Sequence, residues 1–254
     1  MMWIRIAIFL AAGALAARAA DDQEKMFVQH TQAEYHRTQA EYRAKTNDNA
    51  VAWQFARACF EYADIVADSD QRASIANQGI DACKQLLARD PKSAPGHYYL
   101  AMNMGELART KMLGALKLVR EMEVEFKTAL DLNDHFDFGG PARSLALLYR
   151  ESPGWPTSIG SKRKAATCLQ QAMKIAPEFP ENRLVLIETY LKWRDTDSAR
   201  KELDALDTAW PEAQKSFTGE QWEHDWVDWT NRRDDAHAKL SGLQEPTKSP
   251  RNGH

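Results

Sequence analysis

A repeated spacing of small and apolar residues constrains the fold of this chain more than any other feature. Four segments place such residues at relative positions 0, +4 and +7, and each has a helix-ending residue at +12. The four sets are Gly79, Cys83, Leu86 and Pro91; Met122, Phe126, Ala129 and Asp134; Ala165, Leu169, Ala172 and Pro177; and Ala199, Leu203, Leu206 and Pro211. Positions 0, +4 and +7 share one face of an α-helix. The pattern therefore predicts four helices that each bury one face and end near position +12.

Segments with apolar residues at helical spacing also precede these helices. The positions are Phe55, Ala58, Cys59 and Tyr62; Ala142, Leu145, Ala146 and Tyr149; and Arg183, Leu186, Ile187 and Tyr190. Small residues at such positions let two helices approach closely, and the aromatic residue fills the space toward the next hairpin. At these residues the sequence resembles the tetratricopeptide repeat. The resemblance implies an all-α fold of four helical hairpins, stacked as a right-handed solenoid with a C-terminal capping helix.

The N-terminus has the features of a secretory signal. Arg5 precedes an apolar run over residues 6–17, and a small-x-small site follows at Ala17–Ala19. The run is shorter than the ~20 residues that a membrane-spanning helix needs. We expect residues 1–19 to be cleaved, and we expect an exported protein whose mature chain has no membrane span. An uncleaved N-terminal anchor is the alternative.

The rest of the chain divides by pattern into three parts. We expect a weakly docked leader helix over residues 20–46, with Tyr35 and Tyr42 on nearly one face. The helical repeat domain covers residues 47–243. Its last helix carries Trp222, Trp226 and Trp229 at helical spacing, as expected of a helix that covers the end of a repeat array. Residues 244–254 are expected to form a disordered tail.

Composition and motifs disfavour several classes of function. The net charge is −3, from 33 basic and 36 acidic residues, so no basic field for nucleic acid is present. The seven histidines include no pair at i, i+4, and no catalytic, phosphate-loop or dinucleotide motif occurs. The alternation of Glu121, Glu123 and Glu125 with apolar residues indicates a solvated helix face. We therefore expect no catalytic residues, no cofactor and no metal site, and a protein that is not an enzyme.

A sharp turn at Gly139, Gly140 and Pro141 leads into one predicted helix. Pro141 suits the first helical position, and Arg143 then falls in the first turn. Because a cation is unfavourable at the positive end of the helix dipole, we expect an acid to offset Arg143. This acid is either an internal carboxylate or the anionic group of a ligand or partner.

The same stretch carries a more specific resemblance. Gly-Gly-Pro-x-Arg-x-Leu at residues 139–145, Leu148-Tyr149, Ser152-Pro153, an insertion ending at Gly160, and the helix from Ala165 to Pro177 resemble the T-component of TRAP-type transporters. The resemblance implies a periplasmic helical-repeat partner of a solute-binding protein. More distantly, the repeats are similar to the eukaryotic regulators of microtubule dynamics.

These observations predict a non-enzymatic, periplasmic adaptor that binds a partner protein such as a solute-binding protein. The alternative is a binding protein for a small apolar or amphipathic ligand held between the helical hairpins. The candidate binding residues are Arg143, Tyr149, Trp155, Tyr98 and Tyr190. Trp155 lies in the insertion Ser152 to Gly160, where it is either a contact residue at a loop or part of the core.

Cys59 and Cys83 occupy inward positions on the two helices of the first hairpin. We expect the two side chains to face each other. In an oxidising compartment they could form a disulfide, and the alternative is two reduced cysteines that serve as small core residues. Cys168 is left as the odd cysteine in either case.

Overall fold

The structure is a computed structural model that describes residues 25–111 and 113–242. The predicted signal sequence and the predicted tail lie outside the described residues. The chain divides into two compact units, residues 1–129 (unit 1) and residues 130–254 (unit 2).

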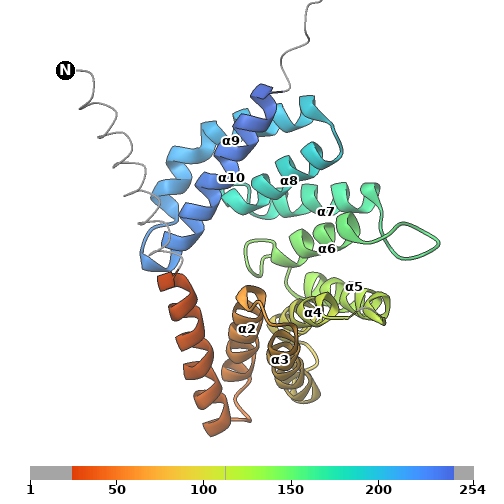
Figure 1. Cartoon of the computed structure of the whole chain (residues 1–254), viewed down its shortest axis with the longest axis vertical. Helices are drawn as coiled ribbons and strands as arrows, with labels where there is room; N and C mark the ends of the chain where they lie inside the picture. Colours follow the sequence, from red (N-terminus) through yellow and green to blue (C-terminus); the bar gives the residue numbers. More distant parts are fainter. Residues whose placement is uncertain (1–24, 112, 243–254) are drawn as a thin grey trace, which may run out of the picture. The chain divides into compact units, whose positions relative to one another are not determined.

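Helices make up both units (Figure 1). A first helix covers residues 25–44. It is followed by α2 (Asn49–Ile65), α3 (Ser69–Arg89), α4 (Ala94–Arg109), α5 (Ala115–Leu132), α6 (Gly140–Glu151), α7 (Lys162–Ile175), α8 (Pro180–Lys192), α9 (Thr196–Ser216), the 3-10 helix η1 (Glu220–Trp222) and α10 (Glu223–Gly242). The boundary between the two units falls within α5.

Short polar residues set where five of these helices begin. In five cases the residue before the helix is an aspartate or serine whose side chain accepts a backbone N–H of the first turn. These residues are Asp48, Asp68, Ser93, Ser161 and Asp195. This hydrogen bond satisfies a donor that the helix itself leaves unpaired. Two helices, α6 and α8, have no such cap and carry a proline in the first turn instead.

In unit 1 the N-terminal helix packs on α2 through aromatic side chains. Tyr35 is only 5% exposed, and its ring centroid lies 5.0 Å from that of Tyr62. The Tyr42 ring stacks on Phe55 at 5.2 Å, and the Tyr35 hydroxyl donates to Gln78 on α3 at 3.1 Å. The expectation of weak docking was therefore wrong, because the seven-residue spacing of the two tyrosines places both rings against α2.

The hairpin of α2 and α3 forms the centre of unit 1, and α4 packs on both helices. The predicted repeat positions are buried, including Gly79, Cys83 and Leu86 on α3 and Met122, Phe126 and Ala129 on α5. A buried asparagine, Asn103, joins α4 to α2 by donating to the Ala56 carbonyl at 2.8 Å. The Asn103 side chain lies directly against Gly79, where a Cβ atom would be 2.3 Å from its Oδ1. Gly79 lies on α3, so the close approach of α3 and α4 requires glycine at this position.

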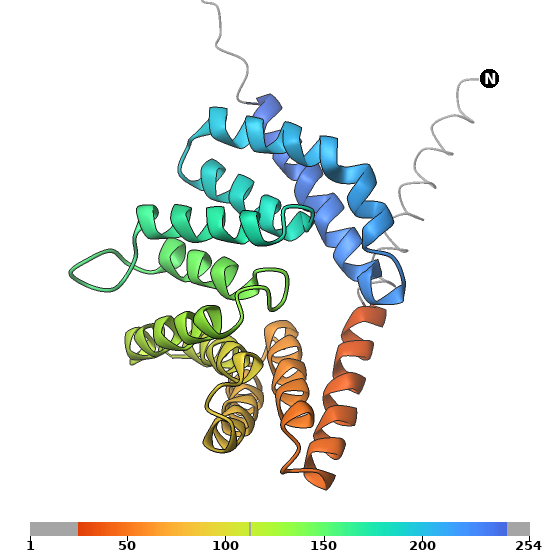
Figure 2. The same cartoon turned by 180° about the vertical axis from the view of Figure 1, so that it is seen from behind.

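Unit 2 contains two hairpins, α6–α7 and α8–α9, and the last helix α10 packs on α8 and α9. These helices lie side by side in Figure 1 and in the reverse view of Figure 2. Trp229, Ala236 and Leu240 bury the inner face of α10 in the core formed with α8 and α9. The predicted capping helix is thus confirmed.

One predicted helix end was wrong. Pro211 was expected just past the end of its helix, but α9 continues to Ser216 with Pro211 inside it. A proline in a helix interior removes one backbone hydrogen bond and costs about 3 kcal/mol. Burial of apolar side chains offsets this cost, because Trp210 and Ala213 lie in the core and the Trp210 ring packs 5.2 Å from Trp226 of α10.

The predicted fold class, an all-α protein of tetratricopeptide-type hairpin repeats, is confirmed. In the described residues the only β interaction is an isolated bridge between Gly154 and Gly160. None of the helices described is both long enough and apolar enough to cross a membrane.

Candidate functional site

The turn before α6 has an unusual backbone. Asp137 (φ 51°), Phe138 (φ 53°) and Gly139 (φ 80°) are three consecutive residues in the left-handed region. Only glycine adopts this region without strain, so the first two residues must be held there by their surroundings. Gly139 also passes close to α7, since a Cβ atom at this position would lie 3.3 Å from the Ala172 Cα.

Arg143 holds this turn together. Its Nη2 donates to Asp137 Oδ2 at 2.8 Å, and its Nη1 donates to Asn182 Oδ1 at 2.8 Å. The guanidinium lies over the Phe179 ring, 5.4 Å from its centroid. Asn182 in turn donates to the Phe138 carbonyl at 2.9 Å. The acid expected opposite Arg143 is therefore an internal one, Asp137.

This arrangement gives Arg143 a structural role. The side chain is buried, with an exposed fraction of 10%, and its donors point to the turn and to α8. An anion of a ligand or partner would have to displace Asp137 from a bond that also stabilises strained backbone. The interpretation of Arg143 as a binding residue is therefore not favoured by the structure.

The three candidate tyrosines lie in different surroundings. Tyr98 and Tyr149 are each 3% exposed, so both are core residues and neither reaches a surface partner. Tyr98 packs against Tyr99 and Phe126, and the Lys164 ammonium covers the Tyr149 ring at 4.8 Å. Their helical spacing placed them on buried faces, so these two predictions were wrong. Tyr190 is partly exposed, and for it a binding role stays a prediction.

Trp155 is the most exposed tryptophan of the described residues, at 89%. It lies in the loop between α6 and α7, whose base is closed by the Gly154–Gly160 bridge and by a hydrogen bond from the Gly160 N–H to the Pro153 carbonyl at 2.9 Å. The core alternative for Trp155 was therefore wrong. The Trp155 indole ring is therefore exposed to solvent on a loop whose two ends are held together by these backbone interactions.

All three cysteines lie in the described part of the chain, and none is in a disulfide. Cys59 and Cys83 are each 0% exposed. Burial raises the pKa of both thiols well above the usual range, and the nearby Cys83 adds to this effect on Cys59. Reactive cysteines have the opposite properties, exposure and a lowered pKa. The geometry favours two reduced core residues.

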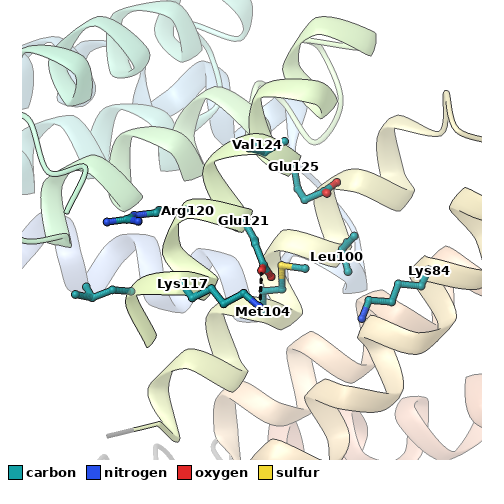
Figure 3. A pocket seen from close by; sticks show the side chains of 9 residues that line it. Lys84, Leu100, Met104, Lys117, Arg120, Glu121, Val124 and Glu125 are labelled. Carbon is teal, nitrogen blue, oxygen red and sulfur yellow. Dashed lines mark ion pairs between the residues drawn. The ribbon is translucent and has the colours of Figure 1, made fainter. Parts of the chain in front are cut away.

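Unit 1 contains a cleft that the sequence did not reveal. Its volume is about 700 Å³, and it lies between α3, α4 and α5 (Figure 3). Leu100 and Met104 of α4, with Leu116 and Val124 of α5, form its apolar surface. The charged lining residues are Lys84, Lys117, Arg120, Glu121 and Glu125.

The charges around the cleft differ in whether they have partners. Glu125 Oε2 lies 2.5 Å from His97 Nδ1, and Glu121 pairs with Lys117 at 3.6 Å. Among the residues that the structure describes, neither Lys84 nor Arg120 pairs with an acid, and both are exposed. The acids at the cleft are thus already paired, whereas two cations remain available.

Within residues 25–111 and 113–242, no three His, Cys, Asp or Glu side chains come together as metal ligands would. The buried carboxylate of Glu106 pairs with Arg72 at 3.5 Å and with Arg109 at 2.9 Å. The ion pairs of Glu106 connect α4 to α3, and its role is thus explained by the fold.

Comparison with known proteins places the fold but not the activity. The family described as Regulator of microtubule dynamics protein 1-3 matches residues 15–137. No curated protein matches the chain. Among solved structures, TTC0263, a thermophilic TPR protein of Thermus thermophilus, has a TM-score of 0.61 at 18% identity, over 84% of this chain and 96% of that chain. A structure of MamA has a TM-score of 0.48 at 17% identity, over 70% of this chain and 87% of that one.

The similarity to TTC0263 shows a tetratricopeptide-type fold. At 18% identity it carries no information on binding partners. The family match ends at residue 137 and so does not reach the Trp155 loop.

Proposed function

We propose that this protein is a non-enzymatic adaptor that binds a partner protein through the Trp155 loop of unit 2. The observation that carries the proposal is the 89% exposure of Trp155. Exposed tryptophan is costly to keep in water and is enriched among the residues that dominate binding energy at protein interfaces. Repeat folds of this type supply extended binding surfaces rather than enclosed reaction sites.

The finer proposal is an exported adaptor whose partner is a periplasmic solute-binding protein. Two features of the sequence support it: the signal-like N-terminus over residues 1–19, and the resemblance of residues 139–177 to the T-component of TRAP-type transporters. The Trp155 loop lies inside this resembling stretch. We do not carry over the microtubule role in the matched family's name, because the match covers residues 15–137 only and export would separate the chain from microtubules.

Site-specific photocrosslinking tests this proposal in the native cell. A photoreactive amino acid replaces Trp155, and in a matched strain it replaces Gln170, an exposed residue of α7. We expect one partner protein to be captured from position 155 and not from position 170. Its identity as a solute-binding protein would support the finer proposal.

Binding of the captured, purified partner is then measured against two variants. Trp155→Ala is expected to weaken binding by about tenfold or more, as loss of a central aromatic contact does. Val227→Ala, which truncates another exposed apolar residue of unit 2 (43% exposed), is the matched control and should bind normally. Unchanged affinity of Trp155→Ala with normal melting would contradict the proposal.

A further inference from the structure

Helix α5 buries one apolar stripe in unit 1 and leaves two further apolar side chains exposed on another side. Met122, Phe126 and Ala129 form the buried stripe predicted by the repeat. Leu116 and Val124 lie eight residues apart on another side of the helix, with Arg120 between them, and they are 38% and 61% exposed. Two large apolar side chains that are exposed beside the same cleft indicate a site of contact.

These two exposed side chains, Leu116 and Val124, border the cleft between α3, α4 and α5. Leu116 and Val124 supply apolar lining from α5, and Leu100 and Met104 supply it from α4. The Val124 and Leu116 side chains are themselves exposed, so the cleft is an open groove rather than an enclosed chamber. An enclosed chamber would suit a small apolar ligand, which buries most of its surface. An open groove suits the apolar face of a partner helix.

The charges beside the groove specify the partner further. The two available cations line the groove from different helices, Lys84 from α3 and Arg120 from α5. A ligand with one anionic head offers a single negative charge to these two cations. A helix with an apolar stripe and acidic residues on both flanks would place acids near Lys84 and Arg120 together.

We propose that the groove between α3, α4 and α5 binds an acidic amphipathic helix of a protein partner. The helix lays its apolar stripe on Leu100, Met104, Leu116 and Val124, and its flanking carboxylates face Lys84 and Arg120. This inference rests on the proposed interaction function, but it concerns a surface of unit 1 that does not include Trp155.

Two synthetic peptides test the inference on the full chain. Both are capped peptides of about five helical turns with leucines at i, i+3, i+4 and i+7; one has glutamates flanking the leucines and the other has lysines. Binding is measured by fluorescence anisotropy. We expect the acidic peptide to bind about tenfold more tightly than the basic one, with an advantage that shrinks at high salt.

Substitutions in the groove locate the binding. Lys84→Glu combined with Arg120→Glu should remove the preference for the acidic peptide. Its matched control is Lys174→Glu with Lys201→Glu, which changes the net charge equally at exposed lysines of unit 2. Leu116→Ser with Val124→Ser should weaken the binding of the acidic peptide by about tenfold, without a change in melting because both side chains are partly exposed.

Several outcomes would overturn the inference. These are equal binding of the two peptides, no saturable binding of either, and binding that the Leu116 and Val124 substitutions leave unchanged. Dodecanoate is tested in the same assay; tighter binding of dodecanoate, lost on Leu116→Ser with Val124→Ser, would identify a small amphiphile as the occupant instead. The Trp155 crosslink reports on unit 2, so its success with a failed peptide test would reject the groove alone, and the reverse result would reject the loop alone.

Discussion

Unit 1 and unit 2 share one repeat spacing, but they differ in how far the outer faces of their helices are covered by other side chains. In unit 2, α10 covers α8 and α9 with Trp229, Ala236 and Leu240, and aromatic rings fill the space around Phe179 and Phe217. In unit 1, α5 leaves Leu116 and Val124 uncovered beside a cleft of about 700 Å³. The repeat pattern therefore specifies which face packs inside a hairpin, whereas additional residues decide whether the remaining faces are covered.

The polar interactions of the two units differ in the same way. In unit 2, Arg232 of α10 pairs with Glu181 and Glu188 of α8, each at 2.6 Å, so the covering helix is also held by charge. In unit 1, Glu106 is buried with Arg72 and Arg109, and its ion pairs hold α4 to helices of its own core.

Removal of the central tryptophan of the covering helix should have the largest effect. Trp229 is 2% exposed, packs on Phe179 and Trp226, and donates from Nε1 to Glu181 at 3.0 Å. Trp229→Ala should lower the free energy of unfolding by about 3–5 kcal/mol, because a large cavity remains and Glu181 loses one of its two donors. Urea denaturation followed by circular dichroism measures this loss. A loss below about 1 kcal/mol would mean that α10 covers little.

Removal of the Arg143 side chain, which joins the turn before α6 to α8, should have the next largest effect on stability. Arg143→Ala leaves Asp137 and Asn182 without their donor, and we expect a loss of about 2–3 kcal/mol in the free energy of unfolding. Arg143→Lys keeps the charge but cannot donate to both partners in the same geometry, so it should recover only part of the loss. Thermal melting of the three proteins checks the order. An Arg143→Ala protein as stable as the wild type would contradict the structural role.

The buried carboxylates of the two units should respond to pH in opposite directions. Burial raises the pKa of Glu106 above the ordinary 4.5, by more than Arg109 and Arg72 lower it. Burial also acts on Glu181, but the positive charges of Arg232 and Arg143 outweigh it, so the pKa of Glu181 is lowered. A raised carboxyl pKa contributes stability below 4.5 that is lost as pH rises through the folded-state pKa. A lowered one contributes stability above 4.5 that is lost as pH falls.

Two variants separate these contributions. Relative to Glu106→Gln, the wild-type protein should lose stability as pH rises above about 4.5. Relative to Glu181→Gln, it should lose stability as pH falls below about 4.5. Urea denaturation at a series of pH values gives both differences. Parallel pH profiles for the two variants would show that the two carboxylates do not differ in this way.

The smallest effect concerns the cysteines of unit 1. Because Cys59 and Cys83 are reduced core residues in the structure, melting of protein from its native compartment should be unchanged by a reductant. A disulfide closing this loop would instead contribute roughly 3 kcal/mol, which the reductant would remove. A non-reducing peptide map provides the chemical control. Detection of a peptide linking the two cysteines would contradict the structure.

The sequence predicted those features that depend on local periodicity. The buried positions Gly79, Leu86, Leu169 and Leu203 followed from the 0, +4, +7 spacing, because burial of one helix face requires that period. The same logic should have excluded Tyr98 and Tyr149 as binding residues, since both lie on buried faces.

Other features depend on partners far away in the chain and had no local signal. The partner of Arg143 across the hairpins is Asn182, 39 residues away, and no pattern in the sequence links the two. The cleft of unit 1 was also missed, because the alternating glutamates around Val124 indicated only a solvated helix face. Whether Val124 faces solvent or a groove depends on how closely α5 approaches α3 and α4, which spacing alone does not determine.

The left-handed turn before α6 has a consequence for the order in which unit 2 becomes protected from solvent. Gly139 provides no side-chain cap, so the first turn of α6 depends on Arg143 and on Asn182, whose amide reaches the Phe138 carbonyl from 44 residues away. Local contacts alone cannot hold Asp137 and Phe138 in their strained backbone. The amide hydrogens at the start of α6 should therefore exchange slowly only after α8 has docked, which makes them reporters of the cooperative closure of the two hairpins.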